Sequence, residues 1–223
     1  MQVSSGSSRT IGRVAWYAAW VGTVLAPIHA IARFATEDGA EDLQSSVVSA
    51  WAEPASSALA PILGFSDAQT VYITYGKAWF FIVGAAALAA FVVRQRRPSV
   101  SGAEKWGWRI ALPGYALVTL SLLGDYWTPW LEQSFLLLGI PGMLLSMVGC
   151  TTLGVGLLRR GYRPRATAWL LTLFLPLFVL LSSVVALGAA IMPMVWAWGI
   201  SGRALTRTGT VDADAPDPRS VAA

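Results

Sequence analysis

The sequence has very few residues of the kinds that build covalent cross-links or metal sites. Among 223 residues there is one cysteine, Cys150, and one histidine, His29. A single cysteine excludes an internal disulfide and a metal cage of cysteines, and a single histidine excludes paired-histidine haem ligation and any multi-histidine metal site. The patterns HExxH, GxSxG and CxxC and the glycine-rich phosphate loop are also missing. We therefore expect no cofactor and no metal, and the sequence names no catalytic residue.

Charged residues are scarce as well. They make up 13% of the chain, against about a quarter in an ordinary soluble domain, whereas hydrophobic residues make up 55%. The mean hydropathy is +0.57. The apolar residues form long runs of roughly 20 residues, the length that crosses about 30 Å of hydrocarbon at about 1.5 Å per helical residue. The expected fold class is all-α, a polytopic membrane helix bundle.

Lysine is rare, but arginine is not, and its placement orients the chain. The net charge of +4 would suit a nucleic-acid partner. The basic residues, however, flank the apolar runs on alternate sides, as the positive-inside rule predicts, so we expect membrane lipids and no nucleic acid as partners. The residues expected at the cytoplasmic side are Arg9, Arg13, Arg94, Arg96, Arg97, Lys105, Arg109, Arg159, Arg160, Arg163, Arg165, Arg203, Arg207 and Arg219. Arg33 and Lys77 fall on the outer side, together with eight of the twelve acids.

These patterns predict six transmembrane helices with both termini in the cytoplasm. The expected spans are about 11–33, 67–93, 109–127, 135–158, 166–181 and 187–204. They are joined by an acidic outer loop, 34–66, and flanked by a disordered N-terminus, 1–10, and a disordered tail, 206–223. The excess of arginine over lysine suggests a high-GC bacterial source, and hence the cytoplasmic cell membrane.

Two parts of this topology have alternatives. Residues 166–205 as one helix would be about 60 Å long, twice the hydrocarbon thickness, and would place Arg203 outside. Two short spans with a turn around Ser182 to Val185 place Arg203 on the cytoplasmic side, with the other basic clusters. The first span could also be a cleaved signal peptide, since Ala30-Ile31-Ala32 resembles a cleavage site, although a retained helix fits its length better.

Local signals predict some helix ends and kinks. Ser66 followed by Gln69 fits a capping box at the start of the second span. Leu43, Val47, Val48 and Trp51 recur at helical spacing, so part of the outer loop is expected to lie on the headgroups. Pro98 and Gly102 mark a turn, and Pro113, Pro141, Pro176 and Pro193 are expected to kink their spans.

Three ionisable residues form a candidate polar layer: His29, Lys77 and Asp125. Each lies 16 or 17 residues from the arginine that borders its span on the inner side. This spacing places all three about 24–26 Å from the inner border, in the outer third of the membrane. Ionisable groups within spans are costly unless they are paired or face water, so the layer is the default functional site. The alternative is that all three only anchor helix ends near the interface.

The fourth span carries a helix-packing stripe of small residues at i+4 spacing: Gly142, Ser146, Cys150 and Gly154. Such stripes let helices approach closely in lipid. Packing within the bundle is the favoured use, and a homodimer or a partner membrane subunit through this span is the alternative.

The sequence leaves the molecular function open. The favoured hypothesis is a binding, accessory or assembly subunit of the membrane. A small transporter with an outward-facing polar site is the first alternative. The second is an intramembrane enzyme that uses His29 and Asp125 as an acid–base pair on a lipid-linked substrate.

Overall fold

The computed structural model describes residues 5–97, 100, 102–185 and 187–211, and within these ranges it contains helices and turns but no strand. The all-helical class is therefore confirmed. The helices are α1 (Ser5–Phe34), α2 (Ser46–Leu63), α3 (Ala68–Gln95), α4 (Gly102–Trp127), α5 (Leu131–Ser134), α6 (Ile140–Arg159), α7 (Arg165–Thr172), α8 (Phe174–Val184) and α9 (Met192–Val211).

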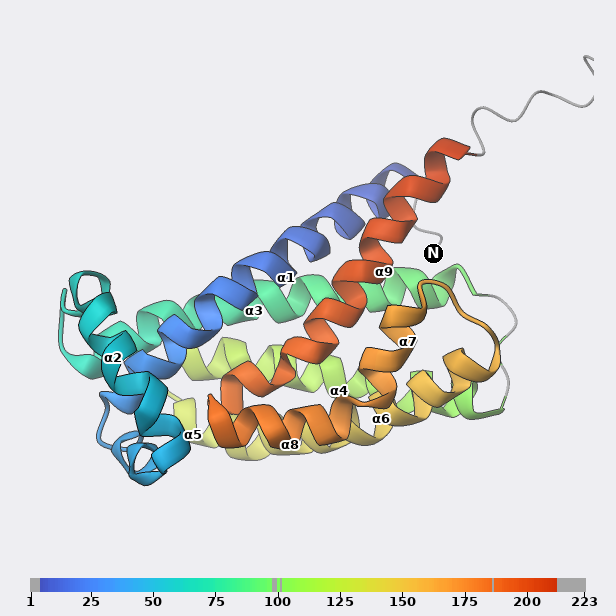
Figure 1. Cartoon of the computed structure of the whole chain (residues 1–223). Coiled ribbons are helices and arrows are strands. Elements are labelled where there is room, and N and C mark those ends of the chain that lie inside the picture. Colours follow the sequence, from blue (N-terminus) through green and yellow to red (C-terminus); the bar gives the residue numbers. More distant parts are fainter. Residues whose placement is uncertain (1–4, 98–99, 101, 186, 212–223) are drawn as a thin grey trace, which may run out of the picture.

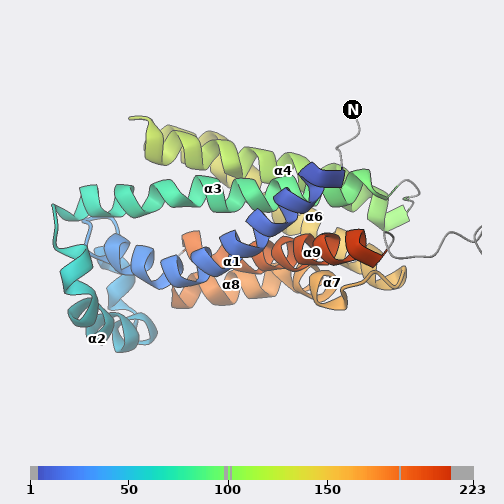
Figure 2. The same cartoon turned by 90° about the horizontal axis from the view of Figure 1, so that it is seen from above.

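The long helices lie side by side and alternate in direction along the chain (Figure 1). α4 packs against α6, and α1 packs against both α9 and α3. The α3–α4 and α6–α7 turns lie at one end of the bundle, which we call the basic end because most arginines gather there. α2 lies at the opposite end, which we call the acidic end after Glu37, Asp38, Glu41, Asp42 and Glu53 (Figure 2).

Three described segments are long and apolar enough to cross a membrane: Gly6–Phe34, Ala68–Gln95 and Leu131–Arg159. The bent pair α7 and α8 would make a fourth. Six spans therefore remain a prediction. Neither α4 nor α9 is among these candidates. α9 is buried on nearly every side between Met192 and Gly202, and an interior helix does not need the apolar surface that lipid requires.

The region 166–205 is not one long helix. α7 and α8 meet at an angle of 66°, and a 3₁₀ turn, Leu187–Ile191, separates α8 from α9. The first break follows from Pro176, which has no N–H to donate to the carbonyl of Thr172 and whose ring crowds that carbonyl. The chain then turns back after Val184, close to the turn expected from the charge pattern.

A π-helical turn precedes the proline in the fourth apolar run. It spans Phe135–Gly139, between α5 and α6, and Pro141 follows at the start of α6. Pro141 cannot donate to the carbonyl of Leu137, so the regular helical pattern is interrupted where a kink was expected.

The expected helix ends need three corrections. The N-cap of α3 is Asp67 and not Ser66, because the Asp67 carboxylate accepts a hydrogen bond from the amide of Thr70 at 2.9 Å. α1 begins at Ser5 and α9 extends to Val211, so each helix reaches into a terminal segment that was expected to be disordered. Residues 1–4, 212–223 and Pro98 lie outside the described residues.

The outer loop forms a helix that packs on the bundle. Val48 and Ala52 of α2 are buried against Ala30 and Phe34 of α1. The indole of Trp51 donates a hydrogen bond to the carbonyl of Val184 at 2.8 Å. α2 is thus attached to the ends of α1 and α8 at the acidic end.

Glycines set the closest helix contacts. A Cβ atom on Gly149 of α6 would lie 2.5 Å from the backbone nitrogen of Ala111 on α4, and one on Gly142 would lie 2.8 Å from that of Val118. The Cys150 thiol is fully buried and lies 3.0 Å from the Tyr115 hydroxyl. Gly154 contacts Thr172 of α7. The small-residue stripe is therefore covered by α4 and α7 of the same chain.

The sides of the bundle carry large apolar side chains. Exposed members include Val14, Tyr17, Val21 and Val24 on α1, Phe81, Leu88 and Phe91 on α3, Leu137 in the π-helical turn, Leu144 and Val148 on α6, and Leu175 and Val179 on α8. A soluble monomer rarely exposes apolar surface on this scale.

Replacing Gly149 with alanine should destabilise the bundle, because the added methyl group overlaps the α4 backbone. We expect a loss of about 1–3 kcal/mol of unfolding free energy, seen as a lower Tm in detergent by circular dichroism. Gly84→Ala is the control, since its nearest neighbour would be 3.6 Å away. Equal Tm changes in both variants would contradict the close approach of α4 and α6.

Candidate functional site

His29 lies inside an aromatic cluster formed by three helices. Its side chain on α1 is 4% exposed. The imidazole stacks on Tyr72 of α3, with ring centroids 4.8 Å apart and an interplanar angle of 18°. It meets the ring of Tyr126 on α4 edge-on at 5.7 Å, and the two tyrosine hydroxyls lie 3.0 Å apart in a hydrogen bond. These contacts join α1, α3 and α4 at one level.

A glycine makes room for this cluster. Any side chain on Gly76 of α3 would overlap the ring of Tyr126. One turn further along α3, the ring of Trp79 lies 6.0 Å from the imidazole. His29 was predicted from the sequence as a candidate, but its aromatic neighbours were not, because α3 and α4 are apolar on several faces.

The other two members of the polar layer lie close to this cluster in the chain but face different partners. Asp125 precedes Tyr126 and accepts a hydrogen bond from Ser121 at 3.0 Å. Lys77 follows Gly76, and its ammonium lies over the ring of Trp127, 5.4 Å from the centroid. Within the described part of the chain, no hydrogen bond or ion pair joins any two of His29, Lys77 and Asp125.

The layer is closed. His29 Nε2 and Asp125 Oδ1 are buried and have no hydrogen-bond partner in the described structure. Neither residue, nor Lys77, lines the three cavities found near this end of the molecule. An acid–base reaction needs both groups within hydrogen-bonding reach of a substrate atom. In the described structure the three side chains are therefore packed among different neighbours and are not joined to one another.

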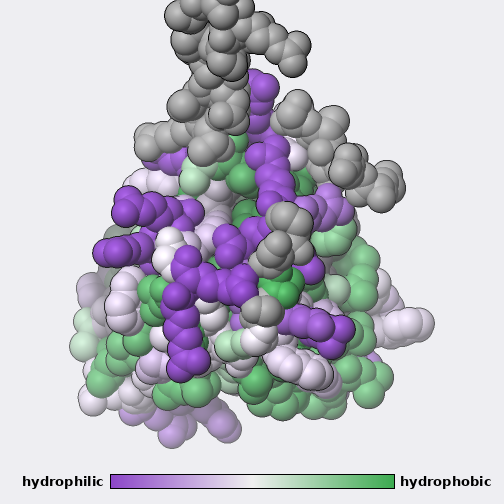
Figure 3. Space-filling view, turned by 90° about the vertical axis from the view of Figure 1, so that its right-hand side faces the viewer, coloured by the Kyte–Doolittle hydropathy of each residue, from purple (hydrophilic) through white to green (hydrophobic). Residues whose placement is uncertain are grey.

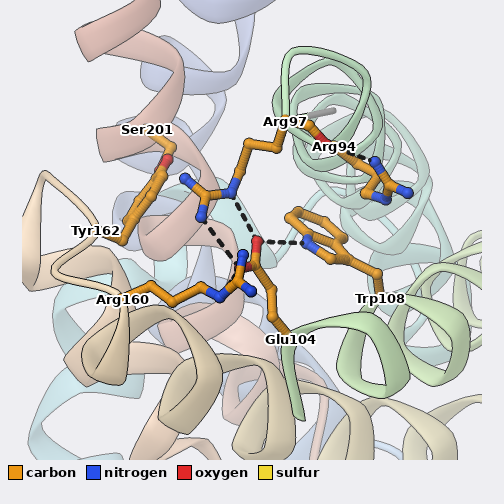
Figure 4. Close-up of polar contacts among 7 residues, drawn as sticks. All are labelled: Arg94, Arg97, Glu104, Trp108, Arg160, Tyr162 and Ser201. Carbon is orange, nitrogen blue, oxygen red and sulfur yellow. Dashed lines mark hydrogen bonds and ion pairs between the residues drawn. The ribbon is translucent and has the colours of Figure 1, made fainter. Parts of the chain in front are cut away.

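A second cluster lies at the basic end, around Glu104 (Figure 4). The Glu104 side chain is fully buried near the start of α4. Arg97 donates to both of its carboxylate oxygens, from Nε at 2.6 Å and from Nη2 at 3.1 Å. The indole of Trp108 donates at 3.3 Å, and Arg160 forms an ion pair at 3.5 Å.

The cluster continues into the remaining helices. The Arg97 guanidinium lies over the ring of Tyr162, 5.1 Å from the centroid. The Tyr162 hydroxyl is 3.0 Å from the hydroxyl of Ser201 on α9, which is 2.9 Å from that of Thr167 on α7. One buried carboxylate is thereby connected to α3, α6, α7 and α9. Sequence reasoning missed this role, although Glu104 is the one acid in the stretch between Arg94 and Arg109.

Two opposing effects act on the pKa of Glu104, which lies before the expected span. Burial raises it, but the hydrogen bonds and charge of Arg97, with Arg160 and Trp108, outweigh burial and hold it below its usual value. Glu104 is therefore ionised at neutral pH. Seen from this end, a band of hydrophilic side chains crosses the middle of the face, and patches of hydrophobic side chains lie on both sides of it (Figure 3).

Comparison with family models, curated proteins and solved structures finds no match to this chain. Among the described residues, no group of three or more histidine, cysteine, aspartate or glutamate side chains is arranged to hold a metal ion. The features that bear on function are therefore the clusters around His29 and Glu104 and the distribution of charged and apolar side chains on the surface.

Replacing Glu104 with glutamine should remove a pH-dependent part of the stability. At neutral pH we expect a loss of about 3 kcal/mol, because two arginines lose a buried counter-charge. Since the folded-state pKa is lowered, the ion pair stabilises the fold above the usual glutamate pKa and is lost as the pH falls below it.

The Tm of the unmodified chain should thus fall more steeply than that of Glu104→Gln between about pH 5 and pH 3. Glu132→Gln, at an exposed position, is the control and should follow the unmodified chain. Parallel Tm curves for Glu104→Gln and the unmodified chain would show that the carboxylate charge does not stabilise the fold.

Proposed function

We propose that this chain is a six-pass protein of the bacterial cytoplasmic membrane, with both termini in the cytoplasm, and that it acts as a binding, accessory or assembly subunit. The observation that carries the proposal is the distribution of charge: an arginine-rich end and an acidic end are separated by sides covered with apolar side chains. A bilayer likewise has an apolar layer between two polar surfaces. Positively charged loops stay on its cytoplasmic side.

The alternation of helix direction supports an even number of passes. α1, α3, α4, the α5–α6 unit, the α7–α8 unit and α9 each run from one end toward the other (Figure 1). With this count, Arg9 and Arg203 both belong to the basic end. Arg203 lies 4.4 Å from the ring centroid of Trp16, an arrangement suited to the headgroup boundary.

The closed polar layer favours binding over transport or catalysis. A transporter needs a site that opens to water, and the notional acid–base pair of an enzyme needs mutual contact. In the described structure, the buried polar atoms of His29 and Asp125 have no hydrogen-bond partner, and the two side chains do not contact each other. The packing of His29 with Tyr72 and Tyr126 instead fits a role in holding α1, α3 and α4 together.

Single cysteines test the orientation. In a Cys150→Ala background, Ser57→Cys on α2 should react with a membrane-impermeant maleimide in intact cells, because the acidic end faces outward. Lys105→Cys, at the exposed start of α4, should react only after the cells are lysed. Labelling of Lys105→Cys in intact cells would overturn the orientation.

A photo-crosslinking amino acid tests the role as a subunit. The exposed stripe on α6 includes Leu144 and Val148, on the opposite side from the buried small residues. Placed at Val148, the crosslinker should give one discrete adduct in native membranes, whereas the same group at Phe81 on α3 should give none. An adduct of twice the chain mass identifies a homodimer, and a smear of lipid adducts at both positions contradicts a subunit role.

A further inference from the structure

A cavity of about 430 Å³ lies at the acidic end, enclosed by the end of α1, by α2 and by the start of α3. This volume is within the range of about 300–1,000 Å³ that small-molecule sites occupy. Its walls are mainly apolar and include Ile31, Phe34, Leu43, Leu63 and Val71. The cavity is separate from the closed layer around His29, which does not line it.

The polar groups of this cavity are hydrogen-bond acceptors. Glu53 is the one charged side chain among the described residues that line it. The Ser56 hydroxyl already donates to the carbonyl of Glu53 at 2.9 Å, and the Ser66 hydroxyl donates to Asp67 at 3.2 Å. In this arrangement both hydroxyls present oxygen lone pairs to a ligand.

The electrostatic potential around the cavity is negative, and it therefore also favours a positively charged ligand. α1 and α2 both end at its wall, so the negative ends of two helix dipoles point toward it. Residues 34–67 hold six acids and no lysine or arginine. The nearby Arg33 is directed to Asp42, with Nε 3.3 Å from the carboxylate, and does not line the cavity. The positive N-terminus of α3 is capped by Asp67.

We propose that this cavity binds a lipophilic cation, with its apolar body between Phe34, Leu63 and Val71 and its charge beside Glu53. Apolar walls supply the affinity for the body of the ligand, and the negative charge of Glu53 disfavours anions. This inference goes beyond the proposed function and does not depend on the number of spans or their orientation.

Two matched probes test the proposal on the full chain in a neutral detergent. Tetraphenylphosphonium and tetraphenylborate have the same shape and opposite charge. In equilibrium dialysis against empty micelles, tetraphenylphosphonium should bind saturably, at one per chain, whereas tetraphenylborate, measured in a separate dialysis, should not bind saturably. Absence of saturable tetraphenylphosphonium binding, or equal binding of both probes, would overturn the proposal.

Variants then locate the site. Glu53→Gln should weaken tetraphenylphosphonium binding at least about fivefold, since it removes the coulombic attraction between the carboxylate and the phosphonium charge. Glu37→Gln removes the same charge from the same loop outside the cavity lining and should change the affinity less than twofold. Ala60→Phe, at an exposed lining position, should fill the cavity and abolish binding.

Equal weakening by Glu53→Gln and Glu37→Gln would mean that diffuse surface charge attracts the probe, and the site would be rejected. Unchanged binding in Ala60→Phe with an unchanged Tm would reject the cavity as its location. Neither result bears on the topology, which the cysteine labelling measures separately.

Discussion

α4 and α6 approach each other so closely that one methyl group on Gly149 would overlap the backbone of Ala111. The same kind of contact joins α1 to α9, where Gly12 and Gly202 meet. In lipid there is no hydrophobic drive between helices, so association depends on close packing and interhelical hydrogen bonds. The bundle depends on these glycines, because they bring the backbones near enough for the buried polar groups to meet.

The two ends of the bundle use polar groups differently. At the basic end, the Glu104 carboxylate accepts hydrogen bonds from Arg97 and Trp108 and forms an ion pair with Arg160. Through these contacts it connects most of the helices that reach this end. At the acidic end, His29 and Asp125 each retain an unpartnered buried atom. The hydrogen bonds and ion pairs of Glu104 stabilise one defined geometry. The unpartnered atoms of His29 and Asp125 instead cost free energy of folding, which the aromatic packing around His29 must offset.

The position of α2 explains why the acidic end has a cavity. Val48, Ala52 and Trp51 attach the helix to α1 and α8. The rest of α2 spans the gap to the start of α3 without filling it, since Ala60 and Ser56 are small. The cavity therefore results from attachment at one end of α2 combined with small residues along its length.

The sequence by itself determined the helical class, the main apolar runs and the segregation of arginine, because these follow from composition and order along the chain. It also indicated two of the helix breaks, near Pro141 and Pro176, whereas Pro113 lies within the uninterrupted helix α4. Only the tertiary structure decided that Glu104 is a buried counter-ion, that His29 stacks on Tyr72, and that Lys77 faces Trp127 and not Asp125. These pairings depend on how each helix is rotated about its axis, and helices that are apolar on several faces carry no periodic signal that fixes that rotation.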